Sequence, residues 1–463
     1  MPASPGRGRP ALGAALLAAL LVAAACARAP GAERRWNVVV VLVDTLRADR
    51  LSLYGYERPT SPALDRFARE RGVVFRDAWA NAGCTFPSVN SILTGAWPQR
   101  FLAAVDKNGM AIPAGLPTLA ERLAARGWAT AAVSASVIAR ATPSGINKQG
   151  GFGAGFAAFD ERCLNESAAC VNERATALLG ALREPFLLYL HYLDPHQPYR
   201  PPAGEERPFS AASRAAATRW ARRGDPETIY RKLYGADPTS DFSPGAARHL
   251  SDLYDDEIHY LDGKLGELLA GLEKSGRLDR TLVVLLSDHG EELLDHGNWG
   301  HCRDLAYSTI LATPLVLAVP GQAAGERRTP VENVDLVPTL LDLLGVPAAP
   351  PAFDGVSRRA LIERGDGAAP AAPLLYAVQG KMRAVRDARR LLLFDLASGH
   401  ETLFPLDRRD AAWKTGAPPG AAAAELRRGL LDWIRRVEGE GSAAEALRHA
   451  ESLERDLRAL GYL

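Results

Sequence analysis

The chain has 463 residues, of which 47% are hydrophobic and 24% charged, and its 55 Lys and Arg almost balance its 54 Asp and Glu. This length allows two or three average domains, or one large α/β domain with a small appendage. A net charge near +1 gives no support to nucleic acid or an acidic membrane surface as the main partner. The composition therefore indicates a globular protein and excludes little else.

The amino terminus predicts export. Arg7 and Arg9 precede an Ala/Leu-rich run that ends at Cys26 and is too short to span a bilayer comfortably. We interpret residues 1–26 as a signal peptide. The segment LVAAAC resembles the bacterial lipobox, in which the Cys is lipidated, although Ala23 stands where Leu is usual; an ordinary cleaved signal is the alternative. Both predict a periplasmic or outer-surface protein, with a membrane anchor if Cys26 is lipidated.

Three apolar runs predict strands that are buried on both faces, and amphipathic stretches between them predict helices. This alternation predicts an α/β fold with a doubly wound, mostly parallel sheet. The strands are expected within 37–45, 186–194 and 281–290, and the main helices after Thr60, after Leu116 and over 250–275.

Each of these runs ends in an acid, namely Asp44, Asp194 and Asp288, and the last is followed by His289. In open sheets, ligands bind at the carboxyl ends of the strands. Three acids at strand ends therefore predict a site there. For any one of them, capping of the next helix is the simpler alternative.

Beyond Gly367 the pattern changes to a Pro/Ala-rich linker, a strand-like run RLLLFDL and a long Ala/Arg/Glu/Leu helix that ends the chain. We expect a small C-terminal α+β subdomain over 368–463, behind a catalytic domain over 34–350.

Seven segments in order resemble the sulfatases of the alkaline-phosphatase superfamily over nearly all of the expected mature length. The resemblance implies an alkaline-phosphatase-like fold, with helices on both faces of the sheet. The segments are VDTLRADRLSLYGYERPTSPALDRFARERGVVF, TFPSVNSILTG, LHYLDPHQPY, YDDEIHYLDGKLGELL, LLSDHGEELLDHGNWGH, VDLVPTLLDLLGV and LRALGYL.

The resemblance implies one divalent metal ion, Mn, Zn, Mg or Ca, held by Asp44, Asp288, His289 and Thr85. Carboxylate with imidazole ligands favours Mn²⁺ or Zn²⁺, because Ca²⁺ prefers an all-oxygen cage. Thr85 would also be the nucleophile, since a metal can lower the pKa of its hydroxyl.

His196 matches the position of a general acid near the leaving oxygen, and His301 that of a residue binding the substrate anion, with Arg303 beside it. A structural role is the alternative for each histidine. Arg47 and Asp49 are expected to brace the first motif through an ion pair. Asp194, His196 and His301 could hold a second ion, but one ion is expected.

The sequence also departs from the sulfatases. Their CxPSR motif carries a Cys that becomes formylglycine, whereas Thr85 stands here at that position, Cys84 is one residue early and Val89 replaces the Arg. Thr45 replaces the second acid of the usual Asp pair, and His289 the usual Asn. We expect no formylglycine.

A Thr nucleophile resembles the phosphoryl-transfer branches of the superfamily. The predicted function is hydrolysis of a sulfuric ester, on a small or polymeric substrate. A phosphoester hydrolase or phosphoryl transferase using Thr85 is the first alternative, and an inactive surface lipoprotein that binds such esters is the second.

Four cysteines remain besides Cys26. Cys163 and Cys170 can close a short loop in an oxidising compartment. Cys84 adjoins the expected nucleophile and Cys302 follows His301, so we hypothesise a disulfide between them; it requires Cα atoms within about 7 Å, and two unrelated buried residues are the alternative.

Overall fold

The computed structural model describes residues 33–102, 112, 115–215, 217, 243–303, 306–348, 352–368, 373–407 and 411–439. The expected signal peptide, Cys26 and the terminal LRALGYL lie outside these residues. Among the helices that are described, none is both long and apolar enough to cross a membrane.

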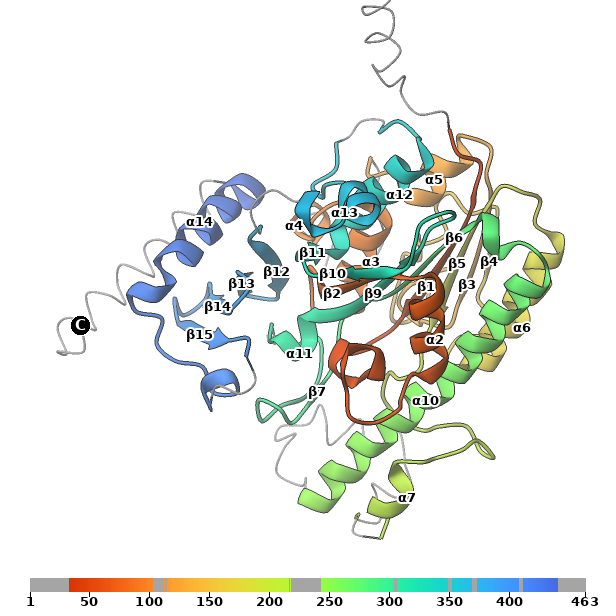
Figure 1. The fold of residues 1–463 in the computed structure, drawn as a ribbon. Coiled ribbons are helices and arrows are strands. Elements are labelled where there is room, and N and C mark those ends of the chain that lie inside the picture. Colours follow the sequence, from red (N-terminus) through yellow and green to blue (C-terminus); the bar gives the residue numbers. More distant parts are fainter. Residues whose placement is uncertain are drawn as a thin grey trace, which may run out of the picture.

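The core is a large sheet whose described strands follow the order β10-β2-β9-β6-β1-β5-β3-β4, with β11 beside β2 (Figure 1). The central strand β1 is parallel to both of its neighbours, β5 and β6, and among the described strands only β9 runs antiparallel to those beside it. This confirms the predicted mostly parallel α/β sheet. The strands are β1 (Asn37–Val43), β2 (Val73–Trp79), β3 (Ala129–Ser134), β4 (Ala158–Asp160), β5 (Phe186–Tyr192), β6 (Thr281–Ser287), β9 (Ala312–Ala318), β10 (Gly325–Arg327) and β11 (Val331–Glu332).

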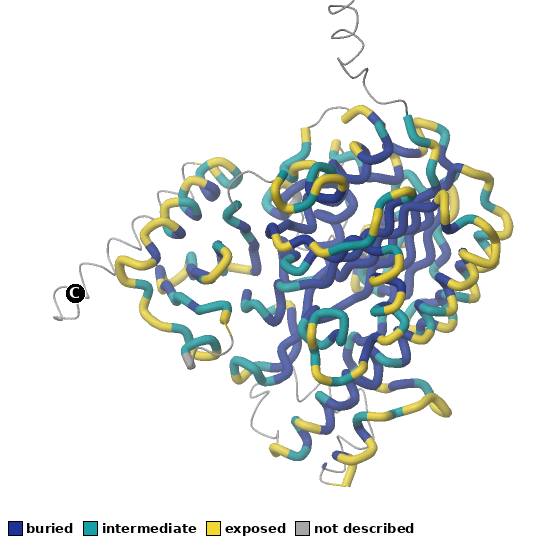
Figure 2. The backbone as a smooth tube through the Cα atoms, in the orientation of Figure 1, coloured by how far each residue is buried: buried dark blue, intermediate teal, exposed yellow. Residues whose placement is uncertain are grey.

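Helices cover both faces of this sheet. Successive side chains of a strand point to opposite sides, so an apolar strand packs against helices on each face. Val39, Val41 and Val43 of β1 belong to the apolar cluster shared with α2 (Pro62–Arg71), α6 (Ala168–Ala181) and α10 (Pro244–Lys274). The alternate residues of β1 pack with α3 (Thr85–Thr94), α5 (Leu119–Ala124) and α12 (Leu336–Leu344). Figure 2 shows the sheet as the buried centre between exposed helical surfaces.

Local sequence sets the helix starts. Helix α5 begins with a capping box between Thr118 and Glu121. Helix α10 starts at Pro244, six residues before the predicted start, because Ser243 caps it and Pro is well suited to the first helical turn. The shorter elements are η1 (Ala48–Arg50), η2 (Ser52–Tyr54), α4 (Gln99–Leu102), α7 (Ser210–Ser213), η3 (Leu278–Arg280), β7 (Glu292–Leu293), β8 (Trp299–Gly300), α11 (Ser308–Leu311), η4 (Asn333–Asp335), α13 (Arg359–Arg364) and η5 (Asp366–Ala368).

The C-terminal region, blue in Figure 1, forms a four-stranded antiparallel sheet of β12 (Leu375–Gln379), β13 (Met382–Arg386), β14 (Arg390–Asp395) and β15 (Glu401–Pro405). Helix α14 (Ala424–Glu438) packs on it, and η6 (Ala411–Trp413) and η7 (Ala421–Ala423) precede that helix. Only β14 and a helix were expected from the sequence. The region is joined to the large sheet by a 2.6 Å ion pair between Arg386 and Asp77.

Candidate active site

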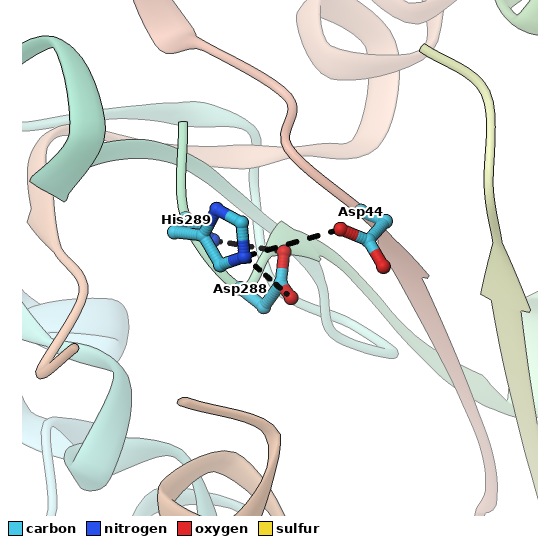
Figure 3. Close-up of side chains that lie close together, drawn as sticks. All are labelled: Asp44, Asp288 and His289. Atoms are coloured by element: carbon cyan, nitrogen blue, oxygen red, sulfur yellow. Dashed lines mark hydrogen bonds and ion pairs between the residues drawn. The ribbon is translucent and has the colours of Figure 1, made fainter. Parts of the chain in front are cut away.

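Two neighbouring strands carry the centre of the site. In the parallel pair of β1 and β6, Val43 lies opposite Ser287, so the next residues, Asp44 and Asp288, leave the sheet side by side. His289 follows directly. One ligand atom from each of Asp44, Asp288 and His289 lies within 4.8 Å of the others, and all three side chains are buried (Figure 3).

The donor atoms of this cluster suit a divalent cation. Asp44 Oδ1 and Asp288 Oδ2 are buried and have no hydrogen-bond partner among the described residues. His289 Nδ1 lies 2.9 Å from the Gly290 carbonyl oxygen, to which it must donate, so the lone pair is on Nε2. Three lone pairs therefore converge, two of them on carboxylates, as a metal of the Mn²⁺ or Zn²⁺ type would require.

The electrostatics favour the same conclusion. Burial raises the pKa of Asp288 to about 7, and the charge of Asp44 adds to this rise. Burial also lowers the pKa of His289, which favours the neutral form of its imidazole. Two carboxylates this close repel one another unless a cation or a proton lies between them.

Thr45, where sulfatases have a second acid, shapes the loop instead of adding a ligand. Its φ is +57°, a left-handed value that is strained for a β-branched residue. In this conformation the Thr45 N–H donates to Asp288 Oδ1 over 3.2 Å, and its carbonyl accepts from the Tyr254 hydroxyl over 2.7 Å. Asp288 Oδ1 is thereby occupied, and Oδ2 faces the cluster.

Thr85 is the first residue of α3, with Cys84 as its N-cap. Its Oγ1 lies 3.3 Å from His289 Nε2. The first turn of a helix has unpaired N–H groups and the positive end of the helix dipole, which favour an anion. One turn further on, Ser88 Oγ donates to the Asp288 carbonyl oxygen over 2.6 Å, which ties α3 to the end of β6.

Two further histidines complete a group of imidazoles. The His301 ring centroid lies 4.7 Å from that of His289 and 5.0 Å from that of His196. His196 Nδ1 lies 2.5 Å from the Gln197 carbonyl oxygen, and His301 Nδ1 lies 2.8 Å from Glu291 Oε1. Both Nδ1 atoms are therefore donors to the protein, which leaves Nε2 as the nitrogen available to a substrate.

Two supporting residues were missed by the sequence analysis. His191 Nε2 donates to Asp44 Oδ2 over 3.3 Å, and its Nδ1 lies 2.9 Å from the Tyr189 hydroxyl. Burial alone would raise the pKa of Asp44, but this hydrogen bond and the neighbouring histidine charges lower it. A histidine inside the apolar run of β5 was the available signal. The other missed residue is Glu291, fully buried, which holds His301.

Asp194, the third strand-end acid, was wrongly expected in this group. Its Oδ2 accepts from the Ala168 N–H over 2.8 Å, at the first residue of α6. Burial raises the pKa of Asp194 to about 6, and its neighbour Glu257 is buried beside it. Asp194 thus caps a helix, because β5 ends beside the start of α6.

The loops around the site are cross-linked. The expected ion pair of Arg47 with Asp49 is present at 2.8 Å, and Arg47 also pairs with Asp295 at 2.6 Å. A Cys84–Cys302 disulfide is formed, with Cα atoms 4.8 Å apart, and Arg303 follows it, half-buried. Cys163 and Cys170 form the second disulfide.

A family comparison agrees with the fold and these strand ends. The family match indicates a hydrolase of the alkaline-phosphatase superfamily, and a cluster at the carboxyl ends of the strands is where open α/β sheets bind their ligands. Residues 36–346 match the model of the Sulfatase family. The chain belongs to the sulfatase family, whose members are ester hydrolases and generally use a divalent metal.

Among curated relatives, the choline-sulfatase of Rhizobium meliloti is 36% identical over 157 residues, which cover 32% of this chain and 30% of that protein. Arylsulfatase A of Homo sapiens is 27% identical over 391 residues, covering 78% of this chain and 73% of that protein. The chain thus spans about a third of the first relative and most of the second.

Solved structures share the fold at low identity. BT4656, in complex with its substrate D-glucosamine-2-N,6-O-disulfate, gives a TM-score of 0.69 at 17% identity, over 89% of this chain and 99% of that one. A phosphonate monoester hydrolase from Silicibacter pomeroyi gives 0.68 at 20% identity, over 87% and 95%.

Proposed function

We propose that this chain is an exported, metal-dependent hydrolase of a sulfuric ester, with Thr85 as the nucleophile. One observation carries the proposal: Thr85 Oγ1 lies 3.3 Å from His289 Nε2, at the edge of a cluster whose ligand atoms lie within 4.8 Å of one another. A hydroxyl beside three convergent lone pairs is the arrangement that a metal-activated nucleophile needs.

Asp44, Asp288, His289 and Thr85 would hold one divalent ion, and the mixed carboxylate and imidazole set favours Mn²⁺ or Zn²⁺. When bound, such an ion would hold the nonbridging oxygens of the ester and lower the pKa of the Thr85 hydroxyl.

The chain's own groups supply the remaining steps. The Thr85 hydroxyl gives its proton to solvent, its Oγ attacks the sulfur or phosphorus atom, and the bond from that atom to the leaving oxygen breaks. His196 Nε2 is positioned to give a proton to that leaving oxygen, since its Nδ1 is bonded to the backbone. His301 Nε2, oriented by Glu291, faces the charged oxygens, and Arg303 adds a positive charge nearby. Water then cleaves the threonyl ester.

A phosphoester substrate is the alternative, and Thr85 itself favours it. A hydrated aldehyde can expel sulfate by breaking its own C–O bond, whereas a threonyl ester must be cleaved by water at sulfur or phosphorus. That second step is the one that phosphate ester hydrolases with a hydroxyl nucleophile use. The fold shared with a phosphonate monoester hydrolase is compatible with this alternative.

The test compares wild type with Thr85→Ala on an aryl sulfate, an aryl phosphate monoester and an aryl phosphodiester, with Mn²⁺, Zn²⁺, Mg²⁺ or Ca²⁺ added in turn. The matched control is Thr94→Ala, which removes a threonine at the other end of the same helix, about 13 Å away at 1.5 Å per residue. We expect turnover in wild type and the control only.

The preferred ester decides between the sulfatase and phosphoesterase alternatives. Equal rates in wild type and Thr85→Ala would contradict the assignment of Thr85 as the nucleophile. If no ester is cleaved, metal content becomes decisive: a protein purified without metal, and unable to take it up, would favour an inactive ester-binding lipoprotein.

Export and lipidation through Cys26 belong to the same proposal and rest on the amino-terminal pattern. Mass spectrometry of the mature protein from a bacterial host tests them. We expect an amino-terminal peptide that begins at Cys26 and carries a diacylglyceryl group, which Cys26→Ser abolishes. If the mature protein instead begins at a nearby residue and carries no lipid, export would still be supported, but a membrane anchor through Cys26 would be ruled out.

A further inference from the structure

The Cys84–Cys302 disulfide connects the chain neighbours of two residues of the proposed mechanism, Thr85 and His301. Cys84 directly precedes Thr85, and Cys302 directly follows His301. Their Cα atoms lie 4.8 Å apart across 218 positions of sequence. One covalent bond therefore holds the turn that carries the nucleophile against the loop that carries the anion-binding histidine.

The loop of His301 has little regular structure of its own. It leaves a hairpin of two-residue strands, β7 and β8, and then reaches Cys302, whose φ of +60° is left-handed. Such a conformation costs a non-glycine residue about 1 kcal/mol or more and persists only where the surroundings hold it. Here the holding contacts include the disulfide and a 3.2 Å hydrogen bond from the Cys302 N–H to the Gly83 carbonyl oxygen.

The metal-ligand cluster does not depend on this bond. Asp44 and Asp288 stand at the ends of β1 and β6, which are paired along their whole length in the centre of the sheet. Breaking the disulfide would release the loop and leave these strand ends in place. Its effect should therefore fall on the alignment of Thr85 with His301, while the three ligands at the strand ends, Asp44, Asp288 and His289, still hold the metal.

The two disulfides also differ in exposure. Cys302 is exposed and Cys84 half-buried, whereas in the second disulfide Cys163 is fully buried and Cys170 half-buried. A soluble dithiol can therefore reach the bond beside the site.

We propose that Cys84–Cys302 is a redox-sensitive positioning element: intact, it aligns Thr85 with His301, and its reduction slows hydrolysis reversibly. In the reduction a dithiol supplies two electrons and two protons; the S–S bond of the protein breaks, two thiols form, and the dithiol closes to its own disulfide. This inference rests on the proposed function, because it assigns that site its dependence on redox state.

The test measures kcat/KM on the best ester for the oxidised full chain, after dithiothreitol, and after reoxidation with oxidised glutathione. Cys84→Ser/Cys302→Ser is the test variant, and Cys163→Ser/Cys170→Ser is the matched control. Metal content is measured in every sample. Since a shift of about 1 Å at a catalytic group can cost about 100-fold, we expect reduction to lower kcat/KM by about 10- to 100-fold.

The expected pattern has three parts. Wild type and the Cys163/Cys170 control lose activity on reduction and regain it on reoxidation, the Cys84/Cys302 variant is slow and indifferent to dithiol, and metal content stays the same. Wild type that keeps its rate when thiol labelling shows both bonds reduced would overturn the inference. So would a folded Cys84/Cys302 variant as fast as wild type.

Binding of inorganic phosphate, followed by calorimetry in both redox states, separates this inference from the proposed function. If no ester is cleaved in the oxidised state, the proposed function fails, but weaker phosphate binding after reduction would still support the positioning element. Phosphate affinity independent of redox state would overturn it in that case. If the serine variant does not fold, reduction of the folded wild type gives the same measurement.

Discussion

Asp44, Asp288 and His289 follow directly on β1 and β6, whereas His196 and His301 stand on loops. The positions of the first group are set by the backbone hydrogen bonds between two central strands, β1 and β6. The second is held by contacts of the loops, namely Glu291 with His301, the Gln197 carbonyl oxygen with His196, Arg47 with Asp295 between β7 and β8, and one disulfide. A site of this kind should lose its metal only through its strand-end ligands or their direct partners, and should lose catalysis through many distant contacts.

The largest effect is expected at a strand-end ligand. Asp288→Asn should remove most bound metal and lower kcat/KM by about 10³-fold or more, because a catalytic metal supplies several kcal/mol and each 1.36 kcal/mol is tenfold. Its matched control is Asp194→Asn, at the end of β5, where the acid caps α6. The control should keep its metal in elemental analysis. Metal loss in both variants would contradict the separation of Asp194 from the cluster.

A smaller effect is expected one contact further out. His191→Ala removes the donor to Asp44 Oδ2, and loss of such a supporting residue typically weakens metal binding by about 10- to 100-fold. Competition with a chelator measures the affinity. His249→Ala is the control, since His249 is also buried but contacts Ser213 on α7. Equal affinities in the two variants would show that His191 does not orient Asp44.

An ion pair in the loops around the site, between Arg47 and Asp295, predicts that the stability of the fold depends on pH. Burial would raise the pKa of Asp295, but the charge of Arg47 outweighs it and lowers the pKa to about 2. The unfolded chain, with the ordinary value near 3.8, takes up this proton first as the pH falls. The ion pair therefore stabilises the fold fully above that value and is lost towards pH 2.

At 1.36 kcal/mol for each pKa unit, this contribution is about 2 kcal/mol. Denaturant unfolding of wild type and Asp295→Asn between pH 5 and pH 2.5 measures it. Wild type should be the more stable at pH 5, and the difference should shrink at the acid end. A difference that stays constant over this range would contradict an ion-pair origin.

The smallest effect on kcat/KM is expected when the residue that supports His301 is changed. Glu291→Gln keeps the size of the side chain but weakens the 2.8 Å contact with His301 Nδ1, and we expect kcat/KM to fall about tenfold, at the lower end for supporting residues. Glu292→Gln is the adjacent control, because Glu292 holds His296 in the same way at 2.9 Å. If Glu292→Gln were the slower enzyme, His296 and not His301 would be the histidine that matters.

Much of the fold could be predicted from the sequence. Continuous apolar runs can be stable only when covered on both faces, so β1, β5 and β6 were foreseeable, as were the amphipathic helices between them. The C-terminal sheet was mostly missed, because β12, β13 and β15 are five-residue strands of mixed polarity. Their pairing partners, and not their own pattern, make them strands.

The site divides in the same way. Asp44, Asp288 and His289 could be expected together because polar residues that end adjacent parallel strands must meet at one edge. The same rule placed Asp194 in this group, but its side chain caps α6. The position of α6 in the folded protein decides which way that side chain turns. His191 gave a signal as a histidine inside an apolar strand, but its role and that of Glu291 lie in contacts with residues 147 and 10 positions away.

The sequence by itself determined the α/β class, the family and the residue types at the strand ends, because these follow from local periodicity and short motifs. Only the tertiary structure decided which atoms converge. It left Asp44 Oδ1 and Asp288 Oδ2 unpaired, turned His289 Nε2 towards Thr85, and joined Cys84 to Cys302. Hydrogen-bond partners and covalent cross-links depend on distances between segments hundreds of residues apart, which local pattern does not encode.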